Sequence, residues 1–479
     1  MRVRGPQRAL VGLLLLCCSR APQPPQLHTT DAAPIQSETY VPPARPAYPL
    51  KVSADKRILV DQNDVPFLVA GDSPQGLVVR LSPAEMRDYF AIRARQGFNA
   101  AWVNAIANKY TGGNAEATTY DGLAPFLAKL ADGHYDLGKP NPAYFAQVDA
   151  AVAAAAERGV LVLLDPIETG GFLDTLRANG MDAAKSYGRY LGERYAAADN
   201  IVWLHGNDLK SWVSETDNDL VHAVALGIRA ADARHLQTVE LDYPKAMSSL
   251  DDAARWQDVL DINTTYTYAP TYAQLHVDYR RENHLPNVMI EANYEGENES
   301  RGPHLTNAHD CRTQYYWSVL AGATGSFYGN KAIWPMAPDW RAHMEDRGAV
   351  AIRHVQAFFT SRAWWRLIPD PDNRVVVEGF GDYATRGNAQ DNTYATTARS
   401  ADGTLVVTYM PTARSVTVDM TKLAGAATAR WFNPTTGGYV PIAGSPFAAT
   451  GTRTFTPPAA RHADASDDWV LVLETEPPP

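Results

Sequence analysis

The sequence contains little cysteine, three residues in 479, and two of them, Cys17 and Cys18, are adjacent near its start. Since only Cys311 lies further along, the rest of the chain cannot form an intramolecular disulfide framework. We expect Cys311 to be a small buried apolar residue. Basic residues are also outnumbered, 43 against 53 acidic ones, which gives a net charge of −10. This balance argues against a nucleic-acid partner, because nucleic-acid binding favours a basic surface.

Long apolar runs and several catalytic motifs are missing as well. Beyond residue 18, no run is long and apolar enough to predict a membrane span. No His-x-His or His-Glu-x-x-His pattern supplies metal ligands, so we expect no metal and no other cofactor. The segment 71–76, "GDSPQG", misses the Gly-x-Ser-x-Gly spacing of a serine-hydrolase nucleophile by one residue. Metal-dependent hydrolases and serine hydrolases are therefore disfavoured.

Residues 1–28 have the pattern of a secretory signal peptide. Arginines precede the apolar run 9–18, and a polar, proline-containing break follows it. We therefore predict a secreted or periplasmic protein. A lipid anchor at Cys17 or Cys18 stays open as an alternative, although Leu16 occupies the position where such signals place a small residue.

Residues 51–366 follow a Pro-, Gln- and Thr-rich stretch, 29–50, which predicts an extended linker. From there, short apolar runs suited to buried parallel strands alternate with longer segments of helical period. Eight such alternations predict a (β/α)₈ TIM barrel, which is an α/β fold. We expect the protein to be a monomer. A doubly wound open sheet is the alternative, but its Gly-rich phosphate-binding turn is absent. The eight runs are 67–71, 100–104, 160–166, 201–206, 236–241, 261–266, 287–291 and 322–329.

Helical segments lie between these runs. Ser82 and Glu85 have the spacing of a capping box at the start of a helix over 82–97. Gly159 is a natural stop for a helix that begins at residue 141. Other candidate helices are 181–197, 217–233, 250–260 and 311–322.

After residue 366 the pattern changes. Short strand-like runs are separated by turns that contain glycine, proline and aspartate, which is typical of an antiparallel β-sandwich. We therefore predict a second domain, a β-sandwich, over 367–479.

Two carboxylates stand where predicted strands end. Asp208 closely follows the run 201–206, and Glu291 ends the run 287–291. In a barrel the C-terminal strand ends carry the chemistry, and the fourth and seventh strands lie across the mouth from each other. Glycoside hydrolysis needs two such groups, one to protonate the leaving oxygen and one to attack or to activate water, about 5–5.5 Å apart when configuration is retained. Structural roles stay open, a helix cap for Asp208 and a buried ion pair for Glu291. Further acids near strand ends are Asp165, Glu240 and Asp242.

Polar and aromatic residues near the strand ends are candidates for substrate binding. Trp203 precedes the expected general acid, which needs a partly desolvated carboxyl with a raised pKa. Hydrogen bonds from Tyr266 or Tyr294 would keep Glu291 ionised. Glu295 is either a partner of this group or, if the register is shifted by one turn, the nucleophile. The remaining candidates are Asp72, Gln75, Asn104 and Asn207; for the first two, a role in a turn is an equal alternative.

Several segments also carry a family resemblance, among them "VPFLVAGDS", "RYAAADNIVWLHGND", "PNVMIEANYEGE", "WWRLIPD" and "WFNPTTGGYVPI". Residues from about 50 to 370 resemble the apiosidase-like glycoside hydrolases (domain of unknown function 4038). The tail resembles the domain named "putative collagen-binding domain of a collagenase". The resemblance implies a barrel and a retaining mechanism, with Asp208 as acid/base, Glu291 as nucleophile and Glu295 as the second motif glutamate. Ile290 replaces the usual glycine and Glu240 stands near a usual histidine, which leaves the sugar open.

These observations predict an exported, retaining glycoside hydrolase that cleaves a side chain of a plant or microbial polysaccharide. Its partner is then a carbohydrate substrate. A non-catalytic secreted carbohydrate- or matrix-binding protein is the alternative from another class. A third interpretation keeps the enzyme and changes the sugar, for example to an arabinofuranoside or a galactofuranoside.

Overall fold

The computed structural model describes residues 45–243, 245 and 247–475. The predicted signal peptide (1–28) and the predicted linker as far as residue 44 lie outside the described residues. Across the described ranges, none of the helices combines the length and the apolar character that a bilayer crossing requires.

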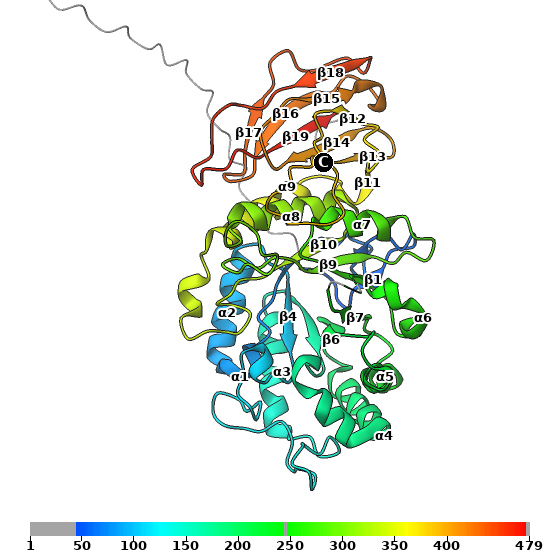
Figure 1. Ribbon diagram of the computed structural model, residues 1–479, viewed down its shortest axis with the longest axis vertical. Helices are drawn as coiled ribbons and strands as arrows, with labels where there is room; N and C mark the ends of the chain where they lie inside the picture. Colours follow the sequence, from blue (N-terminus) through cyan, green and yellow to red (C-terminus); the bar gives the residue numbers. More distant parts are fainter. Residues whose placement is uncertain (1–44, 244, 246, 476–479) are drawn as a thin grey trace, which may run out of the picture. The chain divides into compact units, whose positions relative to one another are not determined.

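Eight parallel strands form the nearly closed barrel that the sequence predicted (Figure 1). Each predicted apolar run overlaps one of them, and hydrogen bonds connect the strands in the order β7-β6-β5-β4-β3-β10-β9-β8. The strands are β3 (Val69–Asp72), β4 (Ala100–Asn104), β5 (Leu161–Asp165), β6 (Ile201–Leu209), β7 (Gln237–Leu241), β8 (Asn263–Tyr266), β9 (Asn287–Glu291) and β10 (Gly325–Tyr328).

Side-chain hydroxyls bridge the gap between β7 and β8, where no regular ladder forms. The hydroxyls of Ser249 and Thr264 both donate to the Val239 carbonyl, at 2.8 and 2.7 Å. The hydroxyl of Thr238 donates to the Ile262 carbonyl at 2.8 Å. These bonds satisfy buried backbone groups that an open sheet edge would leave unpaired.

The helices surround the strands, as Figure 1 shows for α2, α3, α4 and α5. The capping box of Ser82 and Glu85 is present at the start of α2. The expected helix over 250–260 is shorter than predicted, because only Ala253–Trp256 continue a preceding 3₁₀ turn as α-helix. The helices are α1 (Leu77–Arg80), α2 (Pro83–Arg95), α3 (Pro142–Ala156), α4 (Thr169–Tyr195, interrupted at Gly180), α5 (Glu215–Ala231), α6 (Ala253–Trp256), α7 (Thr271–Tyr279), α8 (Ala308–Leu320) and α9 (Arg347–Thr360).

The C-terminal part consists of two antiparallel sheets. One face of the larger sheet packs on the smaller sheet through apolar residues such as Val406 and Trp469. The other face packs on α8 and α9, where the rings of Tyr409 and Tyr316 stack with their centroids 4.5 Å apart. The larger sheet has the order β11 (Leu367–Pro369), β13 (Thr396–Ser400), β14 (Leu405–Met410), β19 (Trp469–Glu474), β16 (Thr428–Asn433), β17 (Gly438–Pro441); the smaller one β12 (Val376–Glu378), β15 (Val416–Asp419), β18 (Thr452–Phe455). A hairpin of β1 (Lys51–Val52) and β2 (Leu59–Val60) precedes the barrel.

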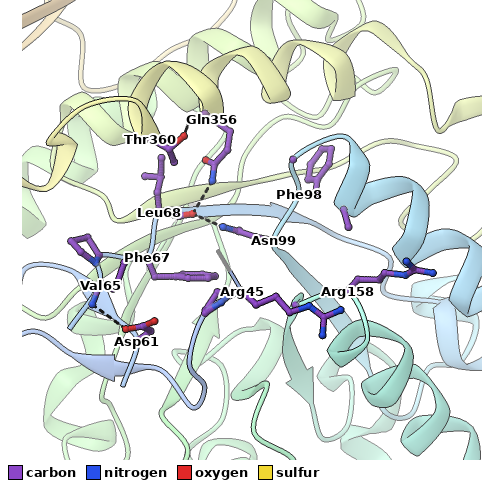
Figure 2. Close-up of a pocket in the computed structure, with 15 residues that line it drawn as sticks. Arg45, Asp61, Val65, Phe67, Leu68, Phe98, Asn99, Arg158, Gln356 and Thr360 are labelled. Carbon is purple, nitrogen blue, oxygen red and sulfur yellow. Dashed lines mark hydrogen bonds between the residues drawn. The ribbon is translucent and has the colours of Figure 1, made fainter. Parts of the chain in front are cut away.

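The N-terminal ends of β3 and β4 border a small cavity of about 130 Å³ (Figure 2). The side-chain amides of Asn99 and Gln356 both donate to the Leu68 carbonyl, at 2.8 and 3.3 Å. Asp61, the one acid among its lining residues, accepts the backbone N–H of Val65 at 3.0 Å. The polar side chains here hold backbone groups together, which is a structural role typical of this end of a barrel.

Candidate active site

The C-terminal strand ends surround an open pocket of about 410 Å³. Asp208 and Glu291 both line it, together with three further acids, whereas Lys210 is the one cation among the lining residues. A pocket of this charge suits a neutral or cationic ligand better than an anionic one. The lining residues are Gln75, Tyr110, Thr111, Asn207, Asp208, Lys210, Asp242, Tyr243, Tyr266, Tyr268, Glu291, Tyr294, Glu297, Glu299 and Trp334.

An irregular pairing of β8 with β9 turns Glu291 toward the pocket. Val288 and Ile290 pack in the apolar interior of the barrel, so strict alternation would direct Glu291 outward. However, Thr265 pairs with Met289 and Tyr266 pairs with Glu291, which leaves one extra residue in β9. Such a bulge re-aims the side chain that follows it.

Tyrosine hydroxyls hold both oxygens of the Glu291 carboxylate. Tyr268 donates to Oε1 at 2.7 Å and Tyr294 donates to Oε2 at 2.8 Å. The hydroxyl of Tyr266 in turn donates to that of Tyr268 at 2.8 Å. Burial and the nearby charge of Asp208 raise the pKa of Glu291 to about 8, although the hydroxyls of Tyr268, Tyr294 and Tyr266 offset part of this rise. The contribution of the Asp208 charge disappears when Asp208 itself is protonated.

Asp208 has fewer donors. Its Oδ2 accepts the hydroxyl of Tyr110, while in the described part of the chain its buried Oδ1 has no hydrogen-bond partner. Burial raises the pKa of the Asp208 carboxyl, and the hydroxyls of Tyr110 and Tyr266 and the Lys210 ammonium offset part of this rise. Because the charges of Asp208 and Glu291 repel each other, ionisation of both at once is disfavoured.

The structure brings four of the expected substrate-binding residues to the pocket wall, namely Gln75, Asn207, Tyr266 and Tyr294. Asn104 is fully buried beneath them, and its side-chain amide donates to Oδ1 of Asn207 at 3.1 Å.

Three other expected residues do not line the pocket. Asp72 is buried and forms an ion pair with Arg93 at 2.5 Å. Trp203 points from β6 toward the helices, where its indole N–H donates to Asp232 at 2.9 Å. The carboxylate of Glu295 accepts the hydroxyl of Tyr328 at 2.5 Å and the N–H of Gly348 at 3.0 Å. All three side chains are occupied by structural contacts.

Tyr110 is the pocket residue that sequence reasoning missed most clearly. It comes from a short 3₁₀ turn, Lys109–Thr111, in the long connection between β4 and α3, which has no strand or helix period. Glu168 holds this turn in place by accepting the N–H of Asn108 at 2.8 Å and the hydroxyl of Thr111.

Trp334 and Glu297 belong to the pocket wall as well, and the indole N–H donates to the Glu297 carboxylate at 2.7 Å. Tyr243 and Tyr268 add further rings, whose faces suit sugar rings by apolar stacking. Within the described ranges, no group of three or more His, Cys, Asp and Glu residues is arranged to hold a metal ion.

Comparisons with known proteins agree with this geometry. Residues 53–366 match the family model "Apiosidase-like, catalytic domain", and residues 371–474 match "Putative collagen-binding domain of a collagenase". No curated protein matches the sequence significantly.

Solved structures of glycoside hydrolases share the fold. A glycoside hydrolase family 5 protein from Bacteroides vulgatus superimposes with a TM-score of 0.74 at 21% identity, over 89% of this chain and 93% of that one. A structure described as a glycoside hydrolase gives a TM-score of 0.73 at 21% identity, over 91% and 98% of the two chains. A family 27 β-L-arabinopyranosidase from Geobacillus stearothermophilus gives a TM-score of 0.52 at 9% identity, over 85% of this chain and 96% of that one.

The family model matches nearly all of the (β/α)₈ barrel, which carries two acids at its C-terminal mouth. Together these findings define the protein as a glycoside hydrolase. The chain belongs to the family of apiosidase-like catalytic domains. The predicted class of enzyme and the predicted fold are therefore confirmed.

Proposed function

We propose that the protein is a retaining glycosidase in which Asp208 is the acid/base and Glu291 the nucleophile. The proposal rests on one observation: Asp208 and Glu291 line the same pocket but differ in their hydrogen-bond partners. One tyrosine hydroxyl donates directly to each carboxylate oxygen of Glu291. Asp208 accepts such a bond from Tyr110 at Oδ2, whereas its Oδ1 has no hydrogen-bond partner among the described residues. We therefore assign the single proton of the pair to Asp208, which gives a general acid beside an ionised nucleophile.

The reaction then takes two steps. In the first, a carboxylate oxygen of Glu291 attacks the anomeric carbon, the glycosidic C–O bond breaks, and Asp208 gives its proton to the leaving oxygen. In the second, Asp208 takes a proton from water, the hydroxide oxygen attacks the same carbon, and Glu291 leaves as a carboxylate. Two inversions at one carbon give net retention of configuration.

The substrate proposed is a neutral glycosyl group on a polysaccharide side chain of plant or microbial origin. The acidic lining supports a neutral sugar, and the rings of Tyr243 and Trp334 support stacking on its faces. The family description supports apiose as the first sugar to test. The N-terminal residue pattern supports export, so we propose that residues 1–28 direct secretion and that 51–366 and 367–479 are the two domains.

Product stereochemistry tests the mechanism. Aryl glycosides of apiose, arabinose and galactose in both ring sizes are incubated with the full-length mature enzyme, and the first-formed sugar is followed by proton NMR before it mutarotates. We expect the released sugar to carry the anomeric configuration of the substrate. An inverted first product would contradict the proposed mechanism, and absence of turnover on every glycoside in the set would contradict the proposed substrate class.

The tyrosine donors give a pH prediction. Removal of the hydroxyl in Tyr294→Phe deletes a hydrogen bond to ionised Glu291, so the pKa of Glu291 rises. Since the active form needs Glu291 ionised, the acid limb of the kcat/KM profile moves to higher pH, by about one unit. Activity lost at low pH should return as the pH increases.

Tyr144→Phe is the matched control for this prediction. Tyr144 is also buried, but its hydroxyl donates to the backbone carbonyl of Ala105 at 3.1 Å, so its loss should leave the acid limb in place. A Tyr294→Phe profile with an unmoved or lowered acid limb would remove the basis for an ionised Glu291.

A further inference from the structure

The end of β6 has an unusual backbone that must be held in place. Gly206, Asn207 and Asp208 all have positive φ, at 115°, 76° and 58°. A non-glycine residue in this region costs free energy and persists only where its surroundings fix it. The hydroxyl of Thr169 donates to the carbonyls of Gly206 and Asn207, at 2.8 and 2.7 Å, and so fixes one side of the turn.

Glu240 fixes the other side. Its Oε2 accepts the backbone N–H of Asp208 at 2.9 Å, from the neighbouring strand β7. The two strands are in direct contact here, because a Cβ placed on Gly206 would lie 2.3 Å from the Glu240 carbonyl oxygen. Glu240 is fully buried and does not line the pocket, so it would influence the reaction through its contact with Asp208.

We propose that Glu240 is a positioning residue for the acid/base, because its carboxyl holds the backbone turn that aims Asp208 into the pocket. This inference rests on the proposed role of Asp208 as general acid. A non-polar side chain at this buried position would leave the Asp208 N–H without its acceptor.

The surroundings of Glu240 also favour its neutral form. Burial raises the pKa of Glu240 well above its usual range, and the charges of Glu291 and Asp208 raise it further. A neutral carboxyl can accept the Asp208 N–H without adding a third negative charge beside the two acids. The amide of glutamine has the same shape and the same acceptor, so it should replace this group.

Leaving-group dependence separates a role through Asp208 from a general structural role. Two aryl glycosides of the sugar that the wild-type enzyme releases are compared, 4-nitrophenyl, which needs protonation more, and 2,4-dinitrophenyl, which needs it less. With Glu240→Leu, kcat on the 4-nitrophenyl glycoside should fall about 10- to 100-fold, a part of the full general-acid contribution. On the dinitrophenyl glycoside the change should stay within about threefold, and KM should change little. With Glu240→Gln, both substrates should stay within about threefold of wild type, because the acceptor remains.

Thr238→Val is the matched control. Thr238 lies two residues earlier on the same strand, is equally buried, and donates to the Ile262 carbonyl rather than to Asp208. We expect it to affect both aryl glycosides equally. Equal losses on both substrates with Glu240→Leu, or a Glu240→Gln variant as impaired as the leucine variant, would overturn the proposal.

A crystal structure of Glu240→Leu decides the question independently of activity. Asp208 should leave the left-handed region and its carboxyl should turn away from the pocket; an unchanged turn would overturn the positioning role. If wild type cleaves no glycoside, the proposed function fails while this structure still tests the turn. If Glu240→Leu does not fold, Glu240→Gln carries the test, because a loss well above threefold in that variant contradicts a role as neutral acceptor.

Discussion

Glu291→Gln should lower kcat/KM for aryl glycosides by about 10³-fold or more, because an amide cannot form the covalent glycosyl intermediate. Glutamine keeps the size of glutamate and one of its two acceptor oxygens for the tyrosine hydroxyls, so the pocket should still bind sugar. Initial rates and ligand binding by calorimetry measure the two effects separately. Lost turnover with retained affinity is the expected outcome.

Glu295→Gln is the matched control, because the same substitution is made four residues further along the chain. The Glu295 carboxylate binds Tyr328 and the Gly348 N–H, outside the pocket, so its loss should act on stability more than on chemistry. Inactivation by Glu295→Gln together with an active Glu291→Gln variant would move the nucleophile to Glu295. An equal, small effect of both substitutions would favour a non-catalytic binding role for the pocket.

Most strands could be predicted because they are apolar runs that are buried by the barrel interior on one face and by helices on the other. The orientation of single side chains was harder to predict. Trp203 precedes Asp208 closely in sequence, but regular alternation in β6 directs it toward the helices. Glu291 faces the pocket because the pairing of β8 with β9 is irregular at this point. No residue pattern within β9 predicts that irregularity.

Other parts of the site depend on contacts between distant segments. Tyr110 reaches Asp208 from a connection without periodic pattern, and Glu168 on another loop holds that connection in place. Glu240 is recognisable in the sequence as an acid at a strand end, but its bond to the Asp208 N–H follows from the three-dimensional proximity of β6 and β7. Position at a strand end therefore predicts which acids lie near the pocket. The role of each acid depends on the hydrogen bonds that its carboxyl accepts.

Asp208→Asn should produce a different kinetic signature from Glu291→Gln. Without a proton donor, cleavage of glycosides with poor leaving groups should fall about 10²- to 10⁴-fold, while 2,4-dinitrophenyl glycosides, which need little protonation, should still form the glycosyl-enzyme. The second step then limits the rate, because water lacks its base. Azide needs no base, so it should accelerate turnover of the dinitrophenyl substrate and give a glycosyl azide with the substrate's configuration.

The matched control for this prediction is Asp242→Asn, which changes the same residue type in the same pocket. The Oδ2 atom of Asp242 lies 3.6 Å from Nζ of Lys210. We assign Asp242 no proton transfer to the leaving group. Its substitution should affect good and poor leaving groups alike and should not respond to azide. The opposite result, with azide rescue for Asp242→Asn and none for Asp208→Asn, would transfer the acid/base role to Asp242. Because azide acts only after Glu291 has attacked, rescue of Asp208→Asn would also require that the nucleophile and the acid are separate residues.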